Sequence, residues 1–254
     1  EINLLSNISR PNIGLITNIS KAHLEGFESF KDLVNTKLAI CDYLAKSEGI
    51  YFLNKDDPNI AGNTAVDAIE NIMSFSTYDE NVDYFGDMSK LEKGILTING
   101  KAFKIPYKTT SFVYNFLASY SIASFLGVDE KSIQNSLYKF RLPKGRGDVI
   151  EVEEAVIIND SYNANLQSMK SGISDIDSIN VEKRKVVLIL GDMLELGNCE
   201  IKIHEELGEY ISSLDFIDTV YGVGMLIKKT IDSIDNKKIE KKYFSDKELL
   251  VCDL

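Results

Sequence analysis

The chain has 254 residues and a formal net charge of -11, a length that suits one large domain or two ordinary ones. Hydrophobic residues make up 44% of it and charged residues 26%, which argues against intrinsic disorder. No apolar run is long enough for a transmembrane helix, and the first residues lack the basic and apolar regions of a signal peptide. The three cysteines, Cys41, Cys199 and Cys252, have no paired spacing, which argues against disulfides or structural zinc and favours a cytoplasmic location.

The charge is unevenly distributed along the chain. Residues 1–147 carry 16 basic and 17 acidic side chains, whereas residues 148–254 carry 12 basic and 22 acidic ones. No basic stripe is present, so a nucleic acid is not an expected partner. The acidic second half is interpreted as a solvated surface that aids solubility.

Apolar runs alternate with amphipathic segments in the first half of the chain. Residues 30–46 predict a helix, because five apolar residues recur on one side of it, namely Leu33, Val34, Leu38, Cys41 and Leu44. Residues 95–105 predict a hairpin, because Asn99-Gly100 is a favoured type I′ turn pair. The other predicted elements are buried strands at 13–19, 50–53 and 72–75 and helices near 111–125 and 129–140.

A second strand–helix series follows a stretch rich in breakers and basic residues, Arg141–Gly147, which predicts a domain boundary after residue 146. The elements predicted beyond it are strands within 149–160 and at 186–190 and 219–223, and helices at 168–179, 201–211 and 225–234. Alternation of this kind implies parallel sheets with helices on their faces. The sequence therefore predicts an α/β protein.

Two glycine patterns are weak candidates for a phosphate-binding loop. The segment from Gly94 to Ala102 has five residues between its glycines instead of four, an alanine where a hydroxyl is needed, and a place in the predicted hairpin. Gly222-Val-Gly224 follows a strand but lacks the third glycine of the dinucleotide fingerprint. Both are interpreted as structural.

Four polar segments follow predicted strands, at the carboxyl ends where functional residues collect in open α/β sheets. They are Thr17–His23, Asn54–Asp57, Asn159–Asn165 and Gly191–Glu195. Each alone is also explained as turn or cap chemistry, for example with Asp160 or Asn165 capping the next helix. The four together favour a site at one predicted edge.

The chain has two histidines. His23 follows a strand and precedes a glycine-containing loop, which suits exposure to a cleft, although a lone histidine is more often structural. His204 lies within a charged helix and is predicted to be on the surface.

These motifs, taken in order, resemble the Mur ligases. Two segments are similar to the central domain of that family, namely Arg10–Ile19 and Ala22–Phe27. The similarity to the C-terminal domain of one member lies in Asn159–Asn165 with Ser168-Met169 and in Gly191–Gly197. The resemblance covers nearly the whole chain. It implies the later part of a central ATPase-type αβ domain over residues 1–146, followed by a smaller Rossmann-like domain over residues 147–254.

Three parts of the family's full enzyme have no counterpart in these residues. They are the N-terminal domain that binds the UDP-sugar, the Gly-rich phosphate loop and an acidic magnesium ligand. The resemblance therefore implies that the chain is part of a longer enzyme and is inactive alone.

The resemblance assigns a metal role to two residues. His23 matches the magnesium-binding histidine, although oxygen ligands are preferred by this ion. Lys37 matches a lysine that is carbamylated by CO₂, which replaces a repelling ammonium by an anion with two oxygens. Carbamylation requires the neutral amine, so a lysine with an ordinary pKa would need help from its surroundings. Without the resemblance, Lys37 is merely a polar residue on an amphipathic helix.

The resemblance also assigns nucleotide and substrate contacts. Asn115 matches the asparagine that reads the adenine edge, and Arg146 matches the nucleotide-binding arginine at the domain junction. Asp160 and Asn163 match positions that approach ATP. The remaining polar residues of the motifs are candidate substrate ligands, namely Thr17, Asn18, Ser161, Asn165, Asp192 and Glu195. The sequence departs from the family pattern at Ser111-Phe112 and at Leu166. Because of the first departure, a second contact with the adenine is not implied.

The activity that the resemblance implies is ATP- and Mg²⁺-dependent amide ligation in peptidoglycan precursor synthesis. A carboxylate of a UDP-N-acetylmuramoyl-tripeptide would be activated as an acyl phosphate and joined to D-alanyl-D-alanine by a cytoplasmic, monomeric enzyme. Two alternatives stay open. One is a related ligase for another amino acid or peptide, and the other is a non-catalytic αβ binding module.

Overall fold

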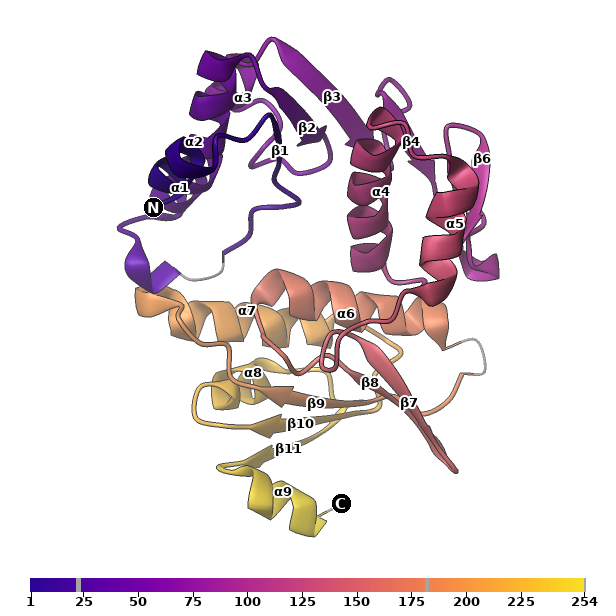
Figure 1. The fold of residues 1–254 in the computed structure, drawn as a ribbon. Helices are drawn as coiled ribbons and strands as arrows, with labels where there is room; N and C mark the ends of the chain where they lie inside the picture. The colour runs from indigo at the N-terminus through magenta and orange to yellow at the C-terminus, as the bar shows by residue number, and fades with distance from the viewer. Residues whose placement is uncertain (22–23, 181–182, 254) are drawn as a thin grey trace. The chain divides into compact units, whose positions relative to one another are not determined.

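A computed structural model describes residues 1–21, 24–180 and 183–253. The chain divides into two compact units (Figure 1), the first formed by Glu1–Ser20 and Ser29–Arg141 and the second by the described residues of Lys21–Glu28 and Leu142–Leu254. Arg146 thus belongs to the second unit, whereas the sequence placed the domain boundary after it. Within the described residues, no helix is long and apolar enough to cross a membrane.

The first unit is built on one six-stranded sheet whose strands lie side by side in chain order. They are β1 (Ile13–Leu15), β2 (Ile50–Asn54), β3 (Asn71–Ser76), β4 (Tyr84–Asp87), β5 (Ile95–Ile98) and β6 (Lys101–Lys104). The first four are parallel, and β5 and β6 are antiparallel additions. The predicted hairpin is confirmed, because Asn99 and Gly100 both have positive φ, 47° and 81°. Its presence also excludes a phosphate loop there.

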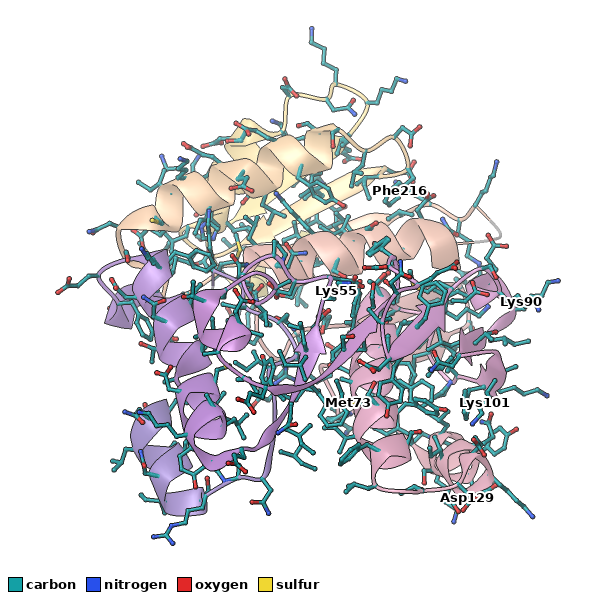
Figure 2. All side chains as sticks on the ribbon, turned by 90° about the horizontal axis from the view of Figure 1, so that it is seen from above. Lys55, Met73, Lys90, Lys101, Asp129 and Phe216 are labelled. Carbon is teal, nitrogen blue, oxygen red and sulfur yellow. The ribbon has the colours of Figure 1, made fainter. Side chains whose placement is uncertain are left out.

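Five α-helices belong to this unit, and Figure 1 shows them beside its sheet. They are α1 (Ile2–Ser9), α2 (Phe30–Ser47), α3 (Thr64–Asp67), α4 (Thr110–Phe125) and α5 (Glu130–Lys139), with short 3₁₀ turns η2 (Leu91–Lys93) in this unit and η1 (Leu24–Gly26) and η3 (Gly197–Cys199) in the other. The apolar side predicted for α2 is confirmed, since its five residues are its buried ones. Asp129, which is labelled together with Lys101 in Figure 2, caps α5. Lys101 pairs with Glu130 in the first turn of that helix.

Aromatic packing fills the space between the sheet and α4. Phe52, Phe75 and Phe103 of the strands are nearly or fully buried. Phe103 meets Phe116 and Tyr120 of α4 edge to face, at centroid distances of 5.6 and 5.1 Å. Edge-to-face contacts add about 0.5–1.5 kcal/mol each to the burial itself. This core fixes α4, the helix that carries Asn115, against the sheet.

The second unit contains a three-stranded parallel sheet and a separate hairpin. The sheet has the order β11 (Glu240–Phe244), β10 (Thr219–Val223), β9 (Val187–Gly191), and the hairpin pairs β7 (Asp148–Val152) with β8 (Ala155–Asn159). Its helices are α6 (Leu166–Ile179), α7 (Glu200–Ser212), α8 (Ile227–Ser233) and α9 (Lys247–Asp253). The mixed α/β class is therefore confirmed. A Cβ on Gly222 would lie 2.5 Å from Ile231, so this glycine serves close packing of α8, as interpreted from the sequence.

One prediction is wrong. His204 is fully buried, at 0% exposure, instead of lying on the surface. Its Nε2 accepts the N–H of Met193 at 3.1 Å, and its Nδ1 lies 2.7 Å from the carbonyl oxygen of Glu200, which requires a neutral ring with the proton on Nδ1. The charged neighbours in sequence concealed a helix face on which His204 stands with Leu207 and Ile211, both buried.

Candidate functional site

The first two polar segments meet at one edge of the sheet in the first unit. The amide of Asn54 donates to the carbonyl oxygen of Thr17 at 2.8 Å, and the buried Asp57 carboxylate accepts the N–H of Ile19 at 2.7 Å. Asn59 adds a bond to the carbonyl oxygen of Ile19 at 2.8 Å. The loop that carries the exposed side chains of Thr17 and Asn18 is therefore held by the end of β2, as expected for neighbouring parallel strands.

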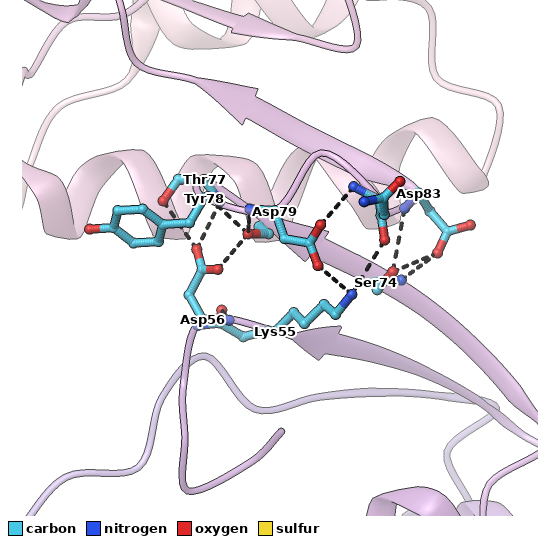
Figure 3. A network of polar contacts seen from close by, with 10 residues as sticks. Lys55, Asp56, Ser74, Thr77, Tyr78, Asp79 and Asp83 are labelled. Carbon is cyan, nitrogen blue, oxygen red and sulfur yellow. Dashed lines mark hydrogen bonds and ion pairs between the residues drawn. The ribbon is translucent and has the colours of Figure 1, made fainter. Parts of the chain in front are cut away.

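Asp56 links the ends of β2 and β3 to α4. Its carboxylate accepts the hydroxyl of Ser76 and, at 2.7 Å, the N–H of Thr77 (Figure 3). It also accepts the phenol of Tyr114, from α4, at 2.8 Å. Burial raises the pKa of Tyr114 well above its usual range, and the hydrogen bond to Asp56 acts in the same direction. Tyr114 therefore stays a neutral donor, and the network anchors the helix turn that carries Asn115.

Lys37 and Asn115 both stand on well-anchored helices of the first unit. Asn115 is exposed on α4, directly after the anchored Tyr114, so its amide can reach a ligand. Lys37 is half-buried on α2, and no described residue forms a hydrogen bond or an ion pair with its ammonium.

The predicted metal pair is only partly described, because His23 lies outside the described residues. Among the residues that the structure does describe, no group of three or more His, Cys, Asp and Glu could hold a metal ion. A carbamate on the Nζ of Lys37 would offer two oxygens, the ligand type that Mg²⁺ prefers.

Arg146 and the Asn159–Asn165 motif come together in the second unit. The N–H of Gly147 donates to the carbonyl oxygen of Asn159 at 2.8 Å, and the N–H of Tyr162 donates to the carbonyl oxygen of Gly145 at 2.9 Å. The guanidinium carbon of Arg146 lies 3.8 Å from the centroid of the Tyr162 ring. Tyr162 is part of the motif recognised in the sequence, but no role was predicted for it.

Asp160 lies beside this arginine and against Gly172 of α6. Desolvation by burial raises the pKa of Asp160 above its ordinary value of 3.8, and Arg146 only partly offsets this effect. A carboxyl group with a raised pKa in the folded state favours folding when it is protonated. This contribution is complete below the unfolded pKa and is lost as the pH rises through the folded pKa.

We therefore expect Asp160→Asn to be more stable than the parent at pH 7 and equally stable near pH 3, because the amide is neutral throughout. Thermal unfolding of both proteins across this range measures the difference. Glu153→Gln, on the turn between β7 and β8, is the matched control and should not change with pH in this way. A variant less stable than the parent at pH 7 would show that Arg146 outweighs desolvation.

The other residues of the motif divide into caps and exposed groups. Asn165 is the N-cap of α6 and forms a capping box with Ser168, the structural role that the sequence left open for it. Ser161 donates to the side chain of Asn159 at 2.7 Å, and Asn163 is exposed, with its side-chain oxygen bound to the N–H of Ala164. Asn163 and Ser161 thus keep side-chain capacity for a ligand.

The last predicted segment, Gly191–Gly197, is fixed mainly by Asp192 and His204. The Asp192 carboxylate accepts the N–H groups of Met225, Leu226 and Ile227 at 2.9, 2.9 and 2.7 Å and so caps α8. Gly224 makes this approach possible, because a Cβ there would lie 2.5 Å from the carboxylate.

The same segment exposes two side chains, Leu194 at its tip and Glu195 after it. Glu195 has a positive φ of 60°, and its carbonyl oxygen accepts the N–H of Glu25 at 3.1 Å. The Asp192 carboxylate is thus occupied by backbone N–H groups, whereas Glu195 is exposed.

Comparison with known families identifies the class of the protein. Residues 1–123 match the Mur ligase middle domain, and residues 145–252 match the Mur ligase, glutamate ligase domain. The two matches together leave few residues uncovered. The chain therefore belongs to the Mur ligase family.

Individual relatives narrow the likeness to one branch of that family. A UDP-N-acetylmuramoyl-tripeptide--D-alanyl-D-alanine ligase of Rickettsia prowazekii is 33% identical over 100% of this chain and 57% of its own. The ligase of the same name from Bacillus subtilis is 32% identical over 89% of this chain and 49% of its own. The chain thus spans about half the length of the curated relatives it matches.

Solved structures from the same branch of the family have a similar fold. MurF from Acinetobacter baumannii aligns with a TM-score of 0.81 and 25% identity over 96% of this chain and 52% of its own. MurF from Thermotoga maritima, solved in complex with ADP, aligns with a TM-score of 0.79 and 25% identity over 99% of this chain and 57% of its own. The fold class predicted from the motifs is confirmed.

Proposed function

We propose that the protein of which this chain is a part is an ATP-dependent, ADP-forming ligase that joins D-alanyl-D-alanine to a UDP-N-acetylmuramoyl-tripeptide. The observation that supports this most directly is the 33% identity to a ligase of that name across the full chain. The likeness to a MurF structure that contains ADP supports a nucleotide as the second ligand. The enzyme would act in the cytoplasm as a monomer.

The reaction would proceed in two balanced steps. The terminal carboxylate of the tripeptide attacks the γ-phosphorus of ATP, which forms an acyl phosphate and releases ADP. The amine of D-alanyl-D-alanine then attacks the acyl carbon, loses a proton, forms the amide bond and releases phosphate. When bound, Mg²⁺ would offset the charge of the ATP phosphates.

The residues of the chain would bind and orient the reactants. On this proposal, Asn115 reads the adenine edge, because its exposed amide offers both a donor and an acceptor. Arg146 binds phosphate or ribose oxygens through its N–H groups. Asp160 and Asn163 approach the same nucleotide, while His23 and a carbamate on Lys37 would hold the metal.

Substrate contacts are assigned to the remaining polar residues of the motifs. These are Thr17 and Asn18 after β1, Ser161 and Asn165 around the start of α6, and Asp192 and Glu195 after β9. The backbone bonds of Asn165 and Asp192 make their contribution one of holding the loops in place.

Phosphate release by the full-length protein tests this function. With ATP, Mg²⁺ and the UDP-linked tripeptide present, we expect release to depend on the amine donor and to be fastest with D-alanyl-D-alanine. Single amino acids such as D-glutamate or a diamino acid serve as comparison donors. Faster release with one of these would favour the related-ligase alternative, and the absence of nucleotide binding would favour a non-catalytic module.

A further inference from the structure

The contact between Arg146 and Tyr162 has the geometry of a cation–π pair. The 3.8 Å between the guanidinium carbon and the ring centroid is well inside the range of about 6 Å for such pairs. The Tyr162 side chain is 68% exposed, and Arg146 is exposed as well. Two long exposed side chains usually sample many rotamers, so their stacking requires a cause.

The backbone around the pair supplies that cause. The segment that carries Arg146 is bonded to the segment that carries Tyr162 on both sides of the arginine, through the carbonyl oxygen of Gly145 and the N–H of Gly147. Gly145 has a positive φ of 76°, and a Cβ there would lie 3.1 Å from the backbone nitrogen of Tyr162. The close approach of the two segments thus depends on a glycine and places the ring beneath the guanidinium.

The ring of Tyr162, not its hydroxyl, makes the contact. Among the described residues the phenol oxygen has no hydrogen-bond partner. A ring that covers one face of a guanidinium consumes none of its N–H donors, because these point outward in the guanidinium plane. A carboxylate partner such as Asp160, which interacts electrostatically with Arg146, would instead occupy those donors.

We propose that Tyr162 is a positioning residue for Arg146, holding the guanidinium by stacking so that its N–H groups stay available for the phosphate or ribose oxygens of the nucleotide. This inference rests on the proposed nucleotide role of Arg146. It predicts that an aromatic side chain is needed at position 162 and that a hydroxyl is not.

Nucleotide kinetics of the full-length enzyme provide the first test. Tyr162→Leu is expected to raise KM for ATP about three- to tenfold, the range for an exposed to partly desolvated cation–π pair, with kcat nearly unchanged. Tyr162→Phe should stay within about twofold of the parent. Tyr138→Leu, which removes another exposed tyrosine, from α5, is the matched control and should have no effect.

A double-mutant cycle separates this inference from the proposed function. Arg146→Ala should raise KM for ATP more than Tyr162→Leu does, and adding Tyr162→Leu to Arg146→Ala should change nothing further. If Arg146→Ala has no effect on KM, the nucleotide role of the arginine fails. If Arg146→Ala has an effect but Tyr162→Leu has none, or both are additive, the positioning role is wrong and the nucleotide role stands.

A spectroscopic readout checks the geometry independently of activity. In full-length protein with isotopically labelled arginine, the Cδ protons of Arg146 should be shifted upfield by the ring current of Tyr162, and Arg146→Ala assigns their signal. The shift should persist in Tyr162→Phe and disappear in Tyr162→Leu. A signal that is the same in the parent and in Tyr162→Leu would overturn the stacking.

Discussion

Replacing Lys37 by methionine in the full-length protein is expected to lower ATP-dependent ligation by about 10²–10³-fold, the usual loss when a preorganised charge-stabilising group is removed from a reaction centre. On the proposed function the neutral amine of Lys37 adds to CO₂, forming an N–C bond and releasing a proton, and the resulting carbamate supplies anionic oxygens. Methionine has a similar length and cannot form this group. Phosphate release with saturating substrates measures the loss.

Replacing Lys37 should not change the folding of the protein, so a loss of activity would report on the role of its amine. Lys37 lies outside the buried side of α2, which is formed by other residues, and methionine is a good helix former. Lys31→Met, at an exposed position of the same helix, is the matched control and should retain full activity. Both variants should melt within about 2 °C of the parent, because neither side chain belongs to the buried side of α2.

Two outcomes would contradict the role of Lys37. One is a Lys37→Met variant with activity within tenfold of the parent and a normal melting temperature. The other is parent activity that is the same in CO₂-depleted buffer and in buffer with added bicarbonate, because a carbamate forms reversibly and requires CO₂. A loss shared by Lys31→Met would indicate a general effect of the helix surface.

Regular elements were predictable because their signals are local. The apolar side of α2 and the turn at Asn99-Gly100 each depend on residues within a few positions of one another, and both are confirmed. The strand β4 and the helix α1 were not predicted. Strand β4 pairs with each neighbour over a short register, and α1 has only eight residues, so both are shorter than the window of about 11–18 residues in which a periodic pattern stands out.

The connections within the candidate site could not be predicted in the same way. Asp56 and Tyr114 are 58 residues apart in sequence, and Asp192 and Met225 are 33 apart. Asp, Asn and Ser after a strand look alike whether they bind a ligand, cap a helix or fasten a loop. The structure distinguishes these cases. Asn165 caps a helix, and Asp192 binds backbone N–H groups of another loop. Asn115 and Glu195 are exposed. The resemblance alone treated all four as ligand contacts.

Asp192→Ala is expected to destabilise the second unit by about 2–4 kcal/mol, because it removes the acceptor of three N–H groups and the negative charge at the start of α8. Gly224 packs directly against the Asp192 carboxylate, since a Cβ there would lie 2.5 Å from it. Asp192→Asn keeps one oxygen acceptor and should lose about half as much, since one oxygen accepts two of the three bonds.

Hydrogen exchange measures this effect at the bonds concerned. In Asp192→Ala the amides of Met225, Leu226 and Ile227 should lose protection, while amides in the sheet of the first unit keep theirs, because stability is local when units unfold separately. Asp232→Ala, which removes an exposed carboxylate of α8 that pairs with Lys228 at 3.0 Å, is the matched control and should cost at most about 0.5 kcal/mol. If the three amides exchange equally in Asp192→Ala and in the parent, the cap contributes nothing, and the Asp192 carboxylate would instead be available to a substrate as the family motif suggests.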